Sequence, residues 1–507
     1  MNYKQLAFLA LFTAFFYAPA TFGQTKPIAD GQPKFLGSAF SSGQSVGFTS
    51  LWNQVTPENG GKWGSVEGTR GVMRWSDMDA AYSTAKNNGM LFKEHTLIWG
   101  AQQPSWIGGL DSAAQRQEIE QWFSLLAARY KDIDYIDVVN EPIHNAPNGM
   151  LPWGATTKNV DYAKALGGAG KTGWDWIVTS FRLARKYFPN SKLIINEYSV
   201  INSSSTTKQY VDIIKLLQAD SLIDGIGEQA HAFTTYGTSS STLKANLDAL
   251  AATGLPIYLT EMDIDGTDDL VQLKEMQRVF SILWEHPGVK GITFWGFRYG
   301  LWRTSQGAYL ITQAGKERPA LTWLKAYVND TLTLADSISL SIENDTTSMV
   351  KKGTSVNIAA TVLPSNTTIP NVSWSVSPTS LATIDSNGKL TTLANGKIKV
   401  TALAWDGSGT KGTLDITIAD HTTGFTNRMS TKRVRIYPNP AKDGNFTLDG
   451  IESIKQIEML DLNGRKIAEF RNSDRPLVKI QVNVSCGVYV LNLFDGEQYF
   501  RKKIVIN

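Results

Sequence analysis

The feature that most constrains the fold is an alternation of short apolar segments and longer amphipathic segments between residues 34 and 329. The apolar segments are rich in Val, Ile, Leu and aromatic residues, as buried strands are. The segments between them repeat apolar residues at helical spacing. The expected strands are 35–40, 51–57, 90–99, 135–140, 192–196, 225–230, 256–260 and 291–295. The clearest expected helices are 112–130, 174–188, 206–220, 242–253 and 270–285.

Strands that alternate with helices favour a parallel sheet of the α/β class. Eight such units over roughly 300 residues fit a closed (β/α)8 TIM barrel. The structural rival is a doubly wound open sheet, but no glycine-rich phosphate turn follows any expected strand. The barrel is therefore the predicted fold of this region.

The rest of the chain has a different sequence pattern. It consists of short Thr, Ser, Val and Ile runs that are separated by turn signals such as Asn387-Gly388 and Asn463-Gly464. No helical period is visible, so two small all-β sandwich domains are expected after the barrel. A chain of 507 residues is also too long for one core. The predicted divisions are 1–23 (signal peptide), 24–333 (barrel), 334–419 (β-sandwich), 420–432 (linker) and 433–507 (second β-sandwich).

The first 23 residues have the order of an export signal. Lys4 precedes an apolar run, 6–18, which small residues follow. The run is too short to span a bilayer as a helix, so a cleaved signal peptide is expected and a stable membrane insertion is not. The single cysteine, Cys486, lies in an alternating apolar stretch, which predicts a buried thiol.

The charge pattern excludes some partners. The net charge is only +3 and no basic cluster precedes the last few residues, so nucleic acid is not an expected partner. The five histidines are scattered without metal-ligand spacing, so neither a catalytic metal nor a cofactor is expected.

Polar residues gather where the expected strands end, which is the face on which such barrels build active sites. Glu141 follows the fourth strand and Glu261 follows the seventh, 120 positions later. At about 30–40 residues per strand–helix unit, the two face each other across the barrel mouth. A lone acid at a strand end is usually a helix cap, but two facing carboxyl groups are what glycosidic cleavage requires.

Five segments resemble glycoside hydrolase family 10, the xylanases, and they occur in the order of that family. Asn-Glu-Pro alone is shared with other barrel glycosidases, whereas the ordered set is specific. The segments are Val-Thr-Pro-Glu-Asn (55–59), His-Thr-Leu-Ile-Trp (95–99), Val-Val-Asn-Glu-Pro (138–142), Gly-Ile-Gly-Glu-Gln-Ala-His (225–231) and Leu-Thr-Glu-Met-Asp-Ile (259–264).

The resemblance implies a retaining endo-β-1,4-xylanase that acts by double displacement. Glu141 would be the acid/base and Glu261 the nucleophile. Asn140 would bond the sugar 2-hydroxyl, and His231 and Asp263 would hold Glu261 in its ionised form. The residues implied to bind substrate are Glu58, Asn59, Lys62, His95, Trp99, Gln102, Gln229, Trp295 and Trp302.

Departures from the family leave other readings open. Gly100 stands where the family usually has a second histidine, and the segment 295–302 lacks the usual acidic, serine-containing spacing. An endo-β-1,4-glucanase or an endo-glycanase of mixed specificity is the nearest alternative. A non-catalytic carbohydrate-binding surface protein is the alternative of another class, and the presence of both Glu141 and Glu261 argues against it. A third possibility is an adhesin that acts through the β-sandwich domains.

The C-terminal regions carry their own resemblances. Residues 334–419, with 373–376 and 384–388, resemble a bacterial Ig-like domain of group 2, for which a spacer role is expected. Residues 433–507, with the segment 434–440, are similar to the sorting domain of type IX secretion. The resemblances imply a secreted, extracellular or cell-surface monomer whose partners are xylan or a related plant cell-wall polysaccharide and the type IX secretion machinery.

Overall fold

The structure is a computed structural model that describes residues 26–152, 156–343, 348–419, 434–472, 475–496 and 499–507. The predicted signal peptide, 1–23, and the predicted linker, 420–432, lie outside the described residues. The chain forms two compact units, residues 1–422 and 423–507. The expected domain boundaries stay predictions.

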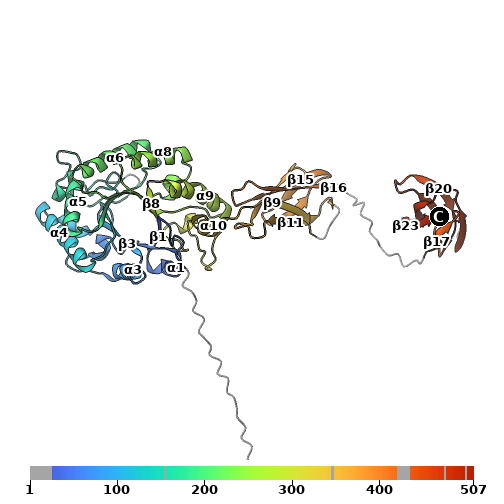
Figure 1. Ribbon diagram of the computed structural model, residues 1–507, viewed down its shortest axis with the longest axis horizontal. Coiled ribbons are helices and arrows are strands. Elements are labelled where there is room, and N and C mark those ends of the chain that lie inside the picture. Colours follow the sequence, from blue (N-terminus) through green and yellow to red (C-terminus); the bar gives the residue numbers. More distant parts are fainter. Residues whose placement is uncertain (1–25, 153–155, 344–347, 420–433, 473–474, 497–498) are drawn as a thin grey trace, which may run out of the picture. The chain divides into compact units, whose positions relative to one another are not determined.

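Eight parallel strands close into a barrel in sequence order, and β1 pairs with β8 to complete it. Helices surround this barrel (Figure 1). The predicted (β/α)8 fold is therefore confirmed. The strands are β1 (Phe35–Phe40), β2 (Gln54–Pro57), β3 (Leu91–Ile98), β4 (Tyr135–Asn140), β5 (Lys192–Glu197), β6 (Gly225–Glu228), β7 (Ile257–Met262) and β8 (Val289–Phe294).

The five helices expected from periodicity are present within two residues of the expected bounds, and two further helices of ten or more residues escaped prediction. One of these, α3, buries only Met78, Ala81 and Ala85, so its apolar stripe is narrow. The other, α10, begins with Pro319, which is favourable in a first turn but reads as a breaker in sequence. The helices are α1 (Phe48–Leu51), α2 (Trp63–Val66), α3 (Ser76–Asn87), α4 (Ser112–Arg129), α5 (Asp175–Tyr187), α6 (Ser204–Ala219), α7 (Ala232–Thr235), α8 (Ser240–Ala251), α9 (Asp269–Glu285) and α10 (Pro319–Val328).

Side-chain caps fix where several of the outer helices begin. Asp111 accepts the amide of Ala114 before α4, and Asp268 accepts two amides at the start of α9. Ser203 and Ser239 cap α6 and α8 in the same way. These contacts satisfy amides that the helices leave free, and they fix where each loop from the carboxyl end of a barrel strand enters its helix.

The second region is an all-β sandwich of two four-stranded sheets, ordered β10-β16-β15-β12 and β13-β14-β11-β9. Its core is formed by residues of both sheets, such as Ile398 and Val400 of the first sheet and Ile358 and Leu390 of the second. Its strands are β9 (Ser337–Ile342), β10 (Met349–Lys351), β11 (Ser355–Leu363), β12 (Val372–Ser377), β13 (Ala382–Ile384), β14 (Lys389–Thr392), β15 (Gly396–Ala404) and β16 (Lys411–Ala419).

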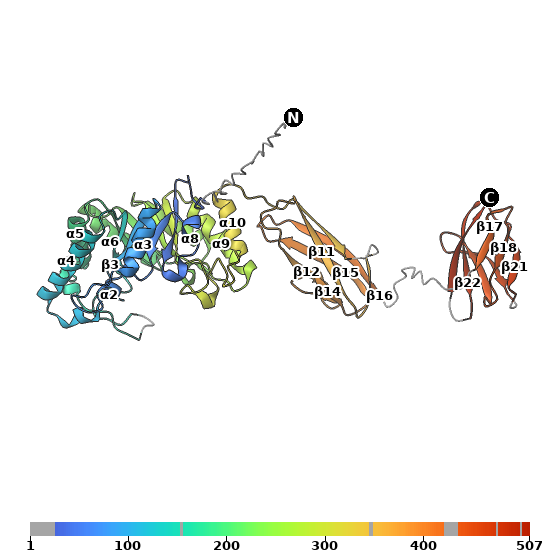
Figure 2. The same cartoon turned by 90° about the horizontal axis from the view of Figure 1, so that it is seen from below.

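The C-terminal unit holds seven strands in the order β20-β19-β22-β23-β17-β18-β21. The neighbouring strands β17, β18 and β21 can be followed in Figure 2. Strands from both ends of this order, through Ile457 and Ile480, reach one core, so the sheet folds over onto itself. Cys486 is exposed, contrary to the sequence prediction, because it lies in the bend before β22 rather than within a strand. The strands are β17 (Arg435–Lys442), β18 (Asn445–Asp449), β19 (Gln456–Leu460), β20 (Lys466–Arg471), β21 (Leu477–Gln481), β22 (Gly487–Phe494) and β23 (Tyr499–Ile506).

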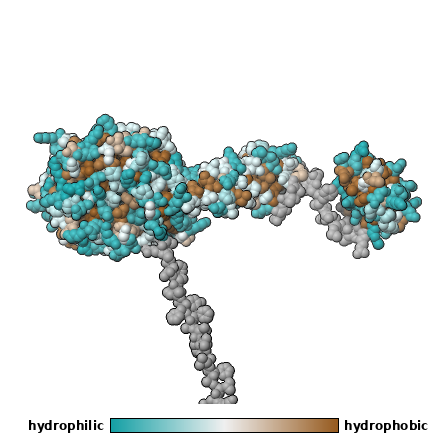
Figure 3. Space-filling view, in the orientation of Figure 1, coloured by the Kyte–Doolittle hydropathy of each residue, from teal (hydrophilic) through white to brown (hydrophobic). Residues whose placement is uncertain are grey.

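The visible face of the barrel is mainly hydrophilic, with apolar side chains scattered over it (Figure 3). Within the described parts of the chain, no helix is both long and apolar enough to cross a membrane.

One buried acid lies outside the catalytic face of the barrel. Glu228 on β6 is fully buried, and its charge acts on Tyr210 of α6, which places the carboxyl between the sheet and the helical layer. Burial raises the pKa of Glu228 to about 8, although nearby backbone amides at Val200 and Ile201 favour the charged form. Neither carboxyl oxygen has a hydrogen-bond partner of normal geometry among the described residues. Glu228 is thus a neutral acid at neutral pH.

This burial predicts a pH-dependent cost in stability. In the unfolded chain Glu228 ionises near its ordinary pKa of about 4.5, whereas in the folded chain it stays protonated up to about pH 8. Between these values the native protein loses stability as pH rises, and Glu228→Gln does not incur this loss. The quantity to compare is the unfolding temperature of Glu228→Gln minus that of wild type. We expect this difference to be a few degrees larger at pH 8 than at pH 5. Tryptophan fluorescence during heating measures this. A difference that is the same at both pH values would contradict it.

Candidate active site

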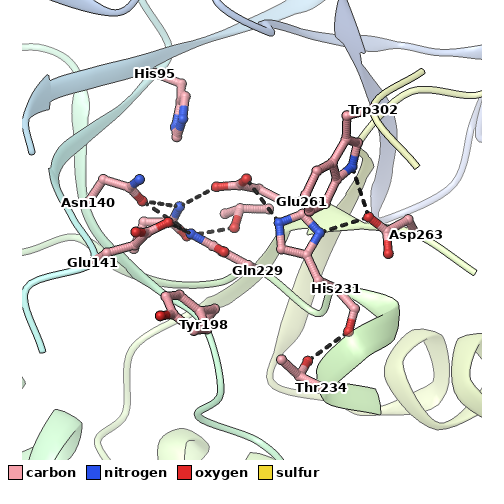
Figure 4. Close-up of polar contacts among 12 residues, drawn as sticks. His95, Asn140, Glu141, Tyr198, Gln229, His231, Thr234, Glu261, Asp263 and Trp302 are labelled. Carbon is pink, nitrogen blue, oxygen red and sulfur yellow. Dashed lines mark hydrogen bonds and ion pairs between the residues drawn. The ribbon is translucent and has the colours of Figure 1, made fainter. Parts of the chain in front are cut away.

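The two acids singled out in the sequence lie at the ends of β4 and β7 and point into one polar network (Figure 4). Glu141 is 8% exposed and Glu261 is 5% exposed, so both carboxyl groups are largely removed from water. Glu141 adopts a left-handed backbone conformation, with φ of 54°, directly after the last residue of β4. Such backbone is uncommon for residues other than glycine, and it occurs often at functional sites.

Three amide side chains connect the acids across the barrel. Asn196, on β5, donates from Nδ2 to Glu261 Oε1 and to Asn140 Oδ1, both at 2.8 Å. Gln229 donates from Nε2 to Glu141 Oε1 at 2.9 Å and lies 3.4 Å from Asn140 Oδ1. Asn140 therefore accepts from both sides, and its own amide nitrogen remains directed to the space between the acids (Figure 4).

Glu261 is held as a carboxylate. His231 lies between two acids, with Nδ1 at 2.8 Å from Asp263 Oδ2 and Nε2 at 3.3 Å from Glu261 Oε2. Burial would lower the pKa of His231, but Asp263 and Glu261 outweigh it and raise the pKa to about 10, so the imidazole carries a charge and donates to both. Burial would likewise raise the pKa of Glu261, but the charges of His95 and His231 and the hydrogen bond from His231 lower it to about 2.

The charge of His231 is the more important of the two at neutral pH. Burial lowers the pKa of His95, which makes its imidazole mainly neutral there. His95 is instead fixed in orientation by Asp137, whose Oδ2 lies 2.9 Å from His95 Nδ1 and 2.6 Å from Lys93 Nζ. All three side chains are buried.

Glu141 has the opposite electrostatic environment. Burial and the charges of Glu197 and Glu261 together raise its pKa to about 7, against hydrogen bonds from Gln229 and Trp99. The indole Nε1 of Trp99 donates to Glu141 Oε2 at 2.9 Å. One acid of the pair therefore keeps a proton near neutral pH while the other does not, which is the division of roles that acid-assisted nucleophilic displacement needs.

A second group of predicted residues lines one wall of the site. Lys62 donates to Asn59 Oδ1 at 2.9 Å and to Gln102 Oε1 at 2.7 Å, and its ammonium lies 5.3 Å from the centre of the Trp99 ring. Burial lowers the pKa of Lys62, and the charges of Glu261, Glu58 and Glu141 oppose this effect. Asn59 and Gln102 are exposed, so this wall offers polar groups to solvent or to a ligand.

Aromatic side chains cover the opposite part. Trp295 is buried and packs edge-on against His95 at 5.1 Å. Trp302 is 48% exposed and donates from Nε1 to Asp263 Oδ2 at 3.1 Å. Phe233, which sequence reasoning did not single out, is 51% exposed and stacks on His231 at 5.2 Å, and Tyr198 lies 6.0 Å from it. Every residue that the sequence predicted for the site is thus linked to this assembly.

The absence of a side chain at position 100 is explained by a close backbone contact. Its amide donates to the carbonyl of Asn145 at 2.9 Å, and a β-carbon built on it would lie 2.3 Å from that oxygen. No side chain fits there unless the loop after β4 moves away. The absence of a histidine at this position thus accompanies a loop that packs directly on β3.

Several residues of the site were missed by sequence reasoning. His144, Asn145 and Glu197 form the surroundings of Glu141, since Glu197 accepts from the amide of Ile143 at 2.8 Å and from His144 Nδ1 at 3.0 Å. Only the polar pair that ends β5 hinted at Glu197 in the sequence. The loop residues follow the Asn-Glu-Pro segment without any pattern of their own.

Among the described residues, no group of three or more His, Cys, Asp or Glu side chains is arranged to hold a metal ion.

Three parts of the chain match known families. Residues 29–327 match glycosyl hydrolase family 10, residues 337–414 match the bacterial Ig-like domain (group 2), and residues 435–507 match the secretion system C-terminal sorting domain. The order is the one that the sequence resemblances predicted. The sorting domain identifies the chain as a secreted protein.

Similar proteins include endo-1,4-beta-xylanase B of Cellvibrio japonicus, 42% identical over 295 residues that make up 57% of this chain and 45% of that protein. Another is an endo-1,4-beta-xylanase of Agaricus bisporus, 32% identical over 237 residues, or 46% of this chain and 66% of that protein. The chain thus spans between about half and two thirds of the length of these curated relatives.

Among solved structures, the barrel resembles native xylanase 10B of Thermotoga maritima, with a TM-score of 0.51 at 24% identity over 61% of this chain and 98% of that structure. This likeness concerns the fold. The family match covers more than half of the chain and includes both network acids. The chain belongs to glycosyl hydrolase family 10.

Proposed function

We propose that this protein is a retaining endo-β-1,4-xylanase in which Glu261 is the nucleophile and Glu141 the acid/base. The observation that carries the proposal is the contrast between two buried carboxyl groups in one hydrogen-bond network. The pKa of Glu141 is raised to about 7, and that of Glu261 is lowered to about 2. A protonated acid and an ionised one are what the first step of glycosidic cleavage with retention needs.

In the first step, an oxygen of Glu261 attacks the anomeric carbon while Glu141 gives its proton to the departing glycosidic oxygen. The C1–O bond to the leaving sugar breaks and a glycosyl ester forms on Glu261. Asn140 is proposed to bond the 2-hydroxyl through its amide nitrogen, because its Oδ1 is already occupied by Asn196. His231 and Asp263 are proposed to keep Glu261 ionised until the attack.

In the second step, Glu141 has lost its proton and acts as the base. It takes a proton from a water molecule that attacks the same carbon, and this releases the sugar with its original configuration and frees Glu261. The pKa of Glu141 falls once the ester forms on Glu261, because the negative charge that faces it has gone. The same residue can thus serve as acid and then as base.

The walls of the site support a polymeric sugar substrate. Glu58, Asn59, Lys62 and Gln102 are proposed to hydrogen-bond sugar hydroxyls on one side, with His95, Trp99 and Gln229 nearer the cleavage point. Trp295 and Trp302 are proposed as aromatic cover, since ring faces stack on the apolar faces of sugars. The names of the similar proteins support xylan as the polymer.

The remaining partners follow from the accessory regions. The sorting domain supports export through type IX secretion machinery, and the Ig-like domain is proposed as a spacer. A monomer, and a plant cell wall as the source of the substrate, stay predictions.

The function is tested by reducing-sugar release from xylan and from carboxymethyl cellulose by the full chain. We expect rapid cleavage of xylan and slow cleavage of the cellulose derivative. Glu261→Ala, which lacks the nucleophile, should lose activity by about a thousandfold or more while keeping its circular dichroism spectrum. NMR of the first product should show the β-anomer, as retention requires.

Other results would change the proposal in distinct ways. Preference for the cellulose derivative would keep the mechanism and make the chain an endo-β-1,4-glucanase. A folded chain that binds either polymer and cuts neither would make it a carbohydrate-binding protein. An α-anomer as first product would exclude the covalent role of Glu261.

The pH dependence of kcat/KM provides a second test. Activity needs Glu261 ionised and Glu141 protonated, so it should fall as pH rises through about 7. Glu197→Gln removes the negative charge that helps to raise the pKa of Glu141. The alkaline limb of the pH profile, where kcat/KM falls as pH rises, should therefore move to lower pH. Glu228→Gln is the matched control, because it removes a buried carboxyl on the neighbouring strand β6, outside the site, and should leave the limb in place. An alkaline limb that does not move in Glu197→Gln would contradict this electrostatic account.

A further inference from the structure

We infer that Asn145, on the loop after β4, is a positioning residue that selects which oxygen of Glu141 carries the catalytic proton. Its Nδ2 donates to Glu141 Oε2 at 2.6 Å, closer than either of the other two donors to this carboxyl group. The inference rests on the proposed function, since it concerns how the acid/base delivers its proton.

The argument begins with the lone pairs of the carboxyl group. Each carboxyl oxygen has two acceptor positions. Oε2 uses both, because Trp99 Nε1 donates to it at 2.9 Å and Asn145 Nδ2 donates as well. Among the described residues, Oε1 accepts a hydrogen bond from Gln229 Nε2 alone, at 2.9 Å. The position that remains open for a proton is therefore on Oε1.

This assignment has a chemical consequence. Oε1 is the oxygen of Glu141 that accepts from Gln229, and Gln229 also contacts Asn140. Asn140 accepts in turn from Asn196, which donates to Glu261, so a proton on Oε1 lies on the side of Glu141 that is connected to Glu261. Oε2, with two donors, takes up the negative charge that remains after the proton has left. Asn145 thus contributes to both steps, because it excludes the proton from the wrong oxygen and then stabilises the carboxylate that acts as base.

The loop that carries Asn145 is built to hold this amide in place. The backbone amide of Asn145 donates to the backbone carbonyl of Glu141 at 2.8 Å. The backbone carbonyl of Asn145 accepts from the amide of Gly100 at 2.9 Å. The glycine at position 100 is required for this approach, since a β-carbon would lie 2.3 Å from the Asn145 oxygen. The departure at Gly100 and the presence of Asn145 beside the acid are therefore parts of one arrangement.

The chain offers a matched control for loosening this loop. Asn159 donates from Nδ2 to the carbonyl of Ala146 at 3.1 Å, one residue beyond Asn145, and no hydrogen bond links it to Glu141 in the described part of the chain. Asn145→Ala and Asn159→Ala each remove one amide from the loop, but only Asn145→Ala removes a donor to the carboxyl group. A general effect on loop stability should appear in both variants.

The test compares kcat/KM of the full-length variants on two substrates. Xylopentaose has a poor leaving group that needs the acid, whereas 2,4-dinitrophenyl β-xylobioside has a good one that does not. We expect Asn145→Ala to lose about tenfold on xylopentaose, the size of one hydrogen bond to a charged group, and less than about threefold on the aryl glycoside. Its alkaline limb should move to higher pH, because a donor that favours the ionised form of Glu141 is gone. Asn159→Ala should show neither change.

Equal losses on both substrates with an unmoved alkaline limb in Asn145→Ala would overturn the inference and leave Asn145 a structural residue. A measurement free of turnover separates this from a failure of the proposed function. The carboxyl carbon of Glu141 can be titrated by ¹³C NMR in inactive Glu261→Gln, with its signal assigned by its loss in Glu141→Gln. A higher pKa after Asn145→Ala supports the inference even if neither substrate is cut, and an unchanged pKa overturns it.

Discussion

The arrangement of the site depends on one buried cation, the imidazolium of His231. It lies between Asp263 and Glu261, and three charged groups in a dry interior are tolerable only because each is bonded to the next. The positive charge keeps Glu261 ionised despite burial, and Glu261 in turn raises the pKa of the facing Glu141. The charge of this imidazole thus contributes to the contrast between the two acids, together with the burial and the charge of Glu197 that raise the pKa of Glu141.

The barrel makes this arrangement possible because its strands end at a common face. Asn140, Asn196 and Gln229 come from or directly follow three successive strands, and their amides span the space between the acids. A rigid sheet holds these groups without reorganisation during reaction, which is the condition for electrostatic stabilisation of a transition state. The polar network and the fold are thus a single structural unit.

The loop after β4 adds a local level of control. Glu197 approaches this loop from β5 and raises the pKa of Glu141, while Trp99 and Asn145 donate to its Oε2 and oppose that rise. Glu141 thus lies between a charge that favours its neutral form and donors that favour its ionised form. Because a residue of this kind must hold a proton in one step and lose it in the next, such a balance suits its proposed role.

The sequence by itself determined the barrel and the two acids, because strand and helix periods are local and the motif around each acid is contiguous. It predicted the partners His231 and Asp263 through the family resemblance. It did not predict Glu228 as a neutral buried acid, the exposure of Cys486, or the contacts of His144 and Asn145 with the site. Only the tertiary structure decided these, since burial and hydrogen-bond partners depend on which distant segments meet in space. Gly100 shows this clearly, because its role depends on a carbonyl 45 positions away that no local pattern connects to it.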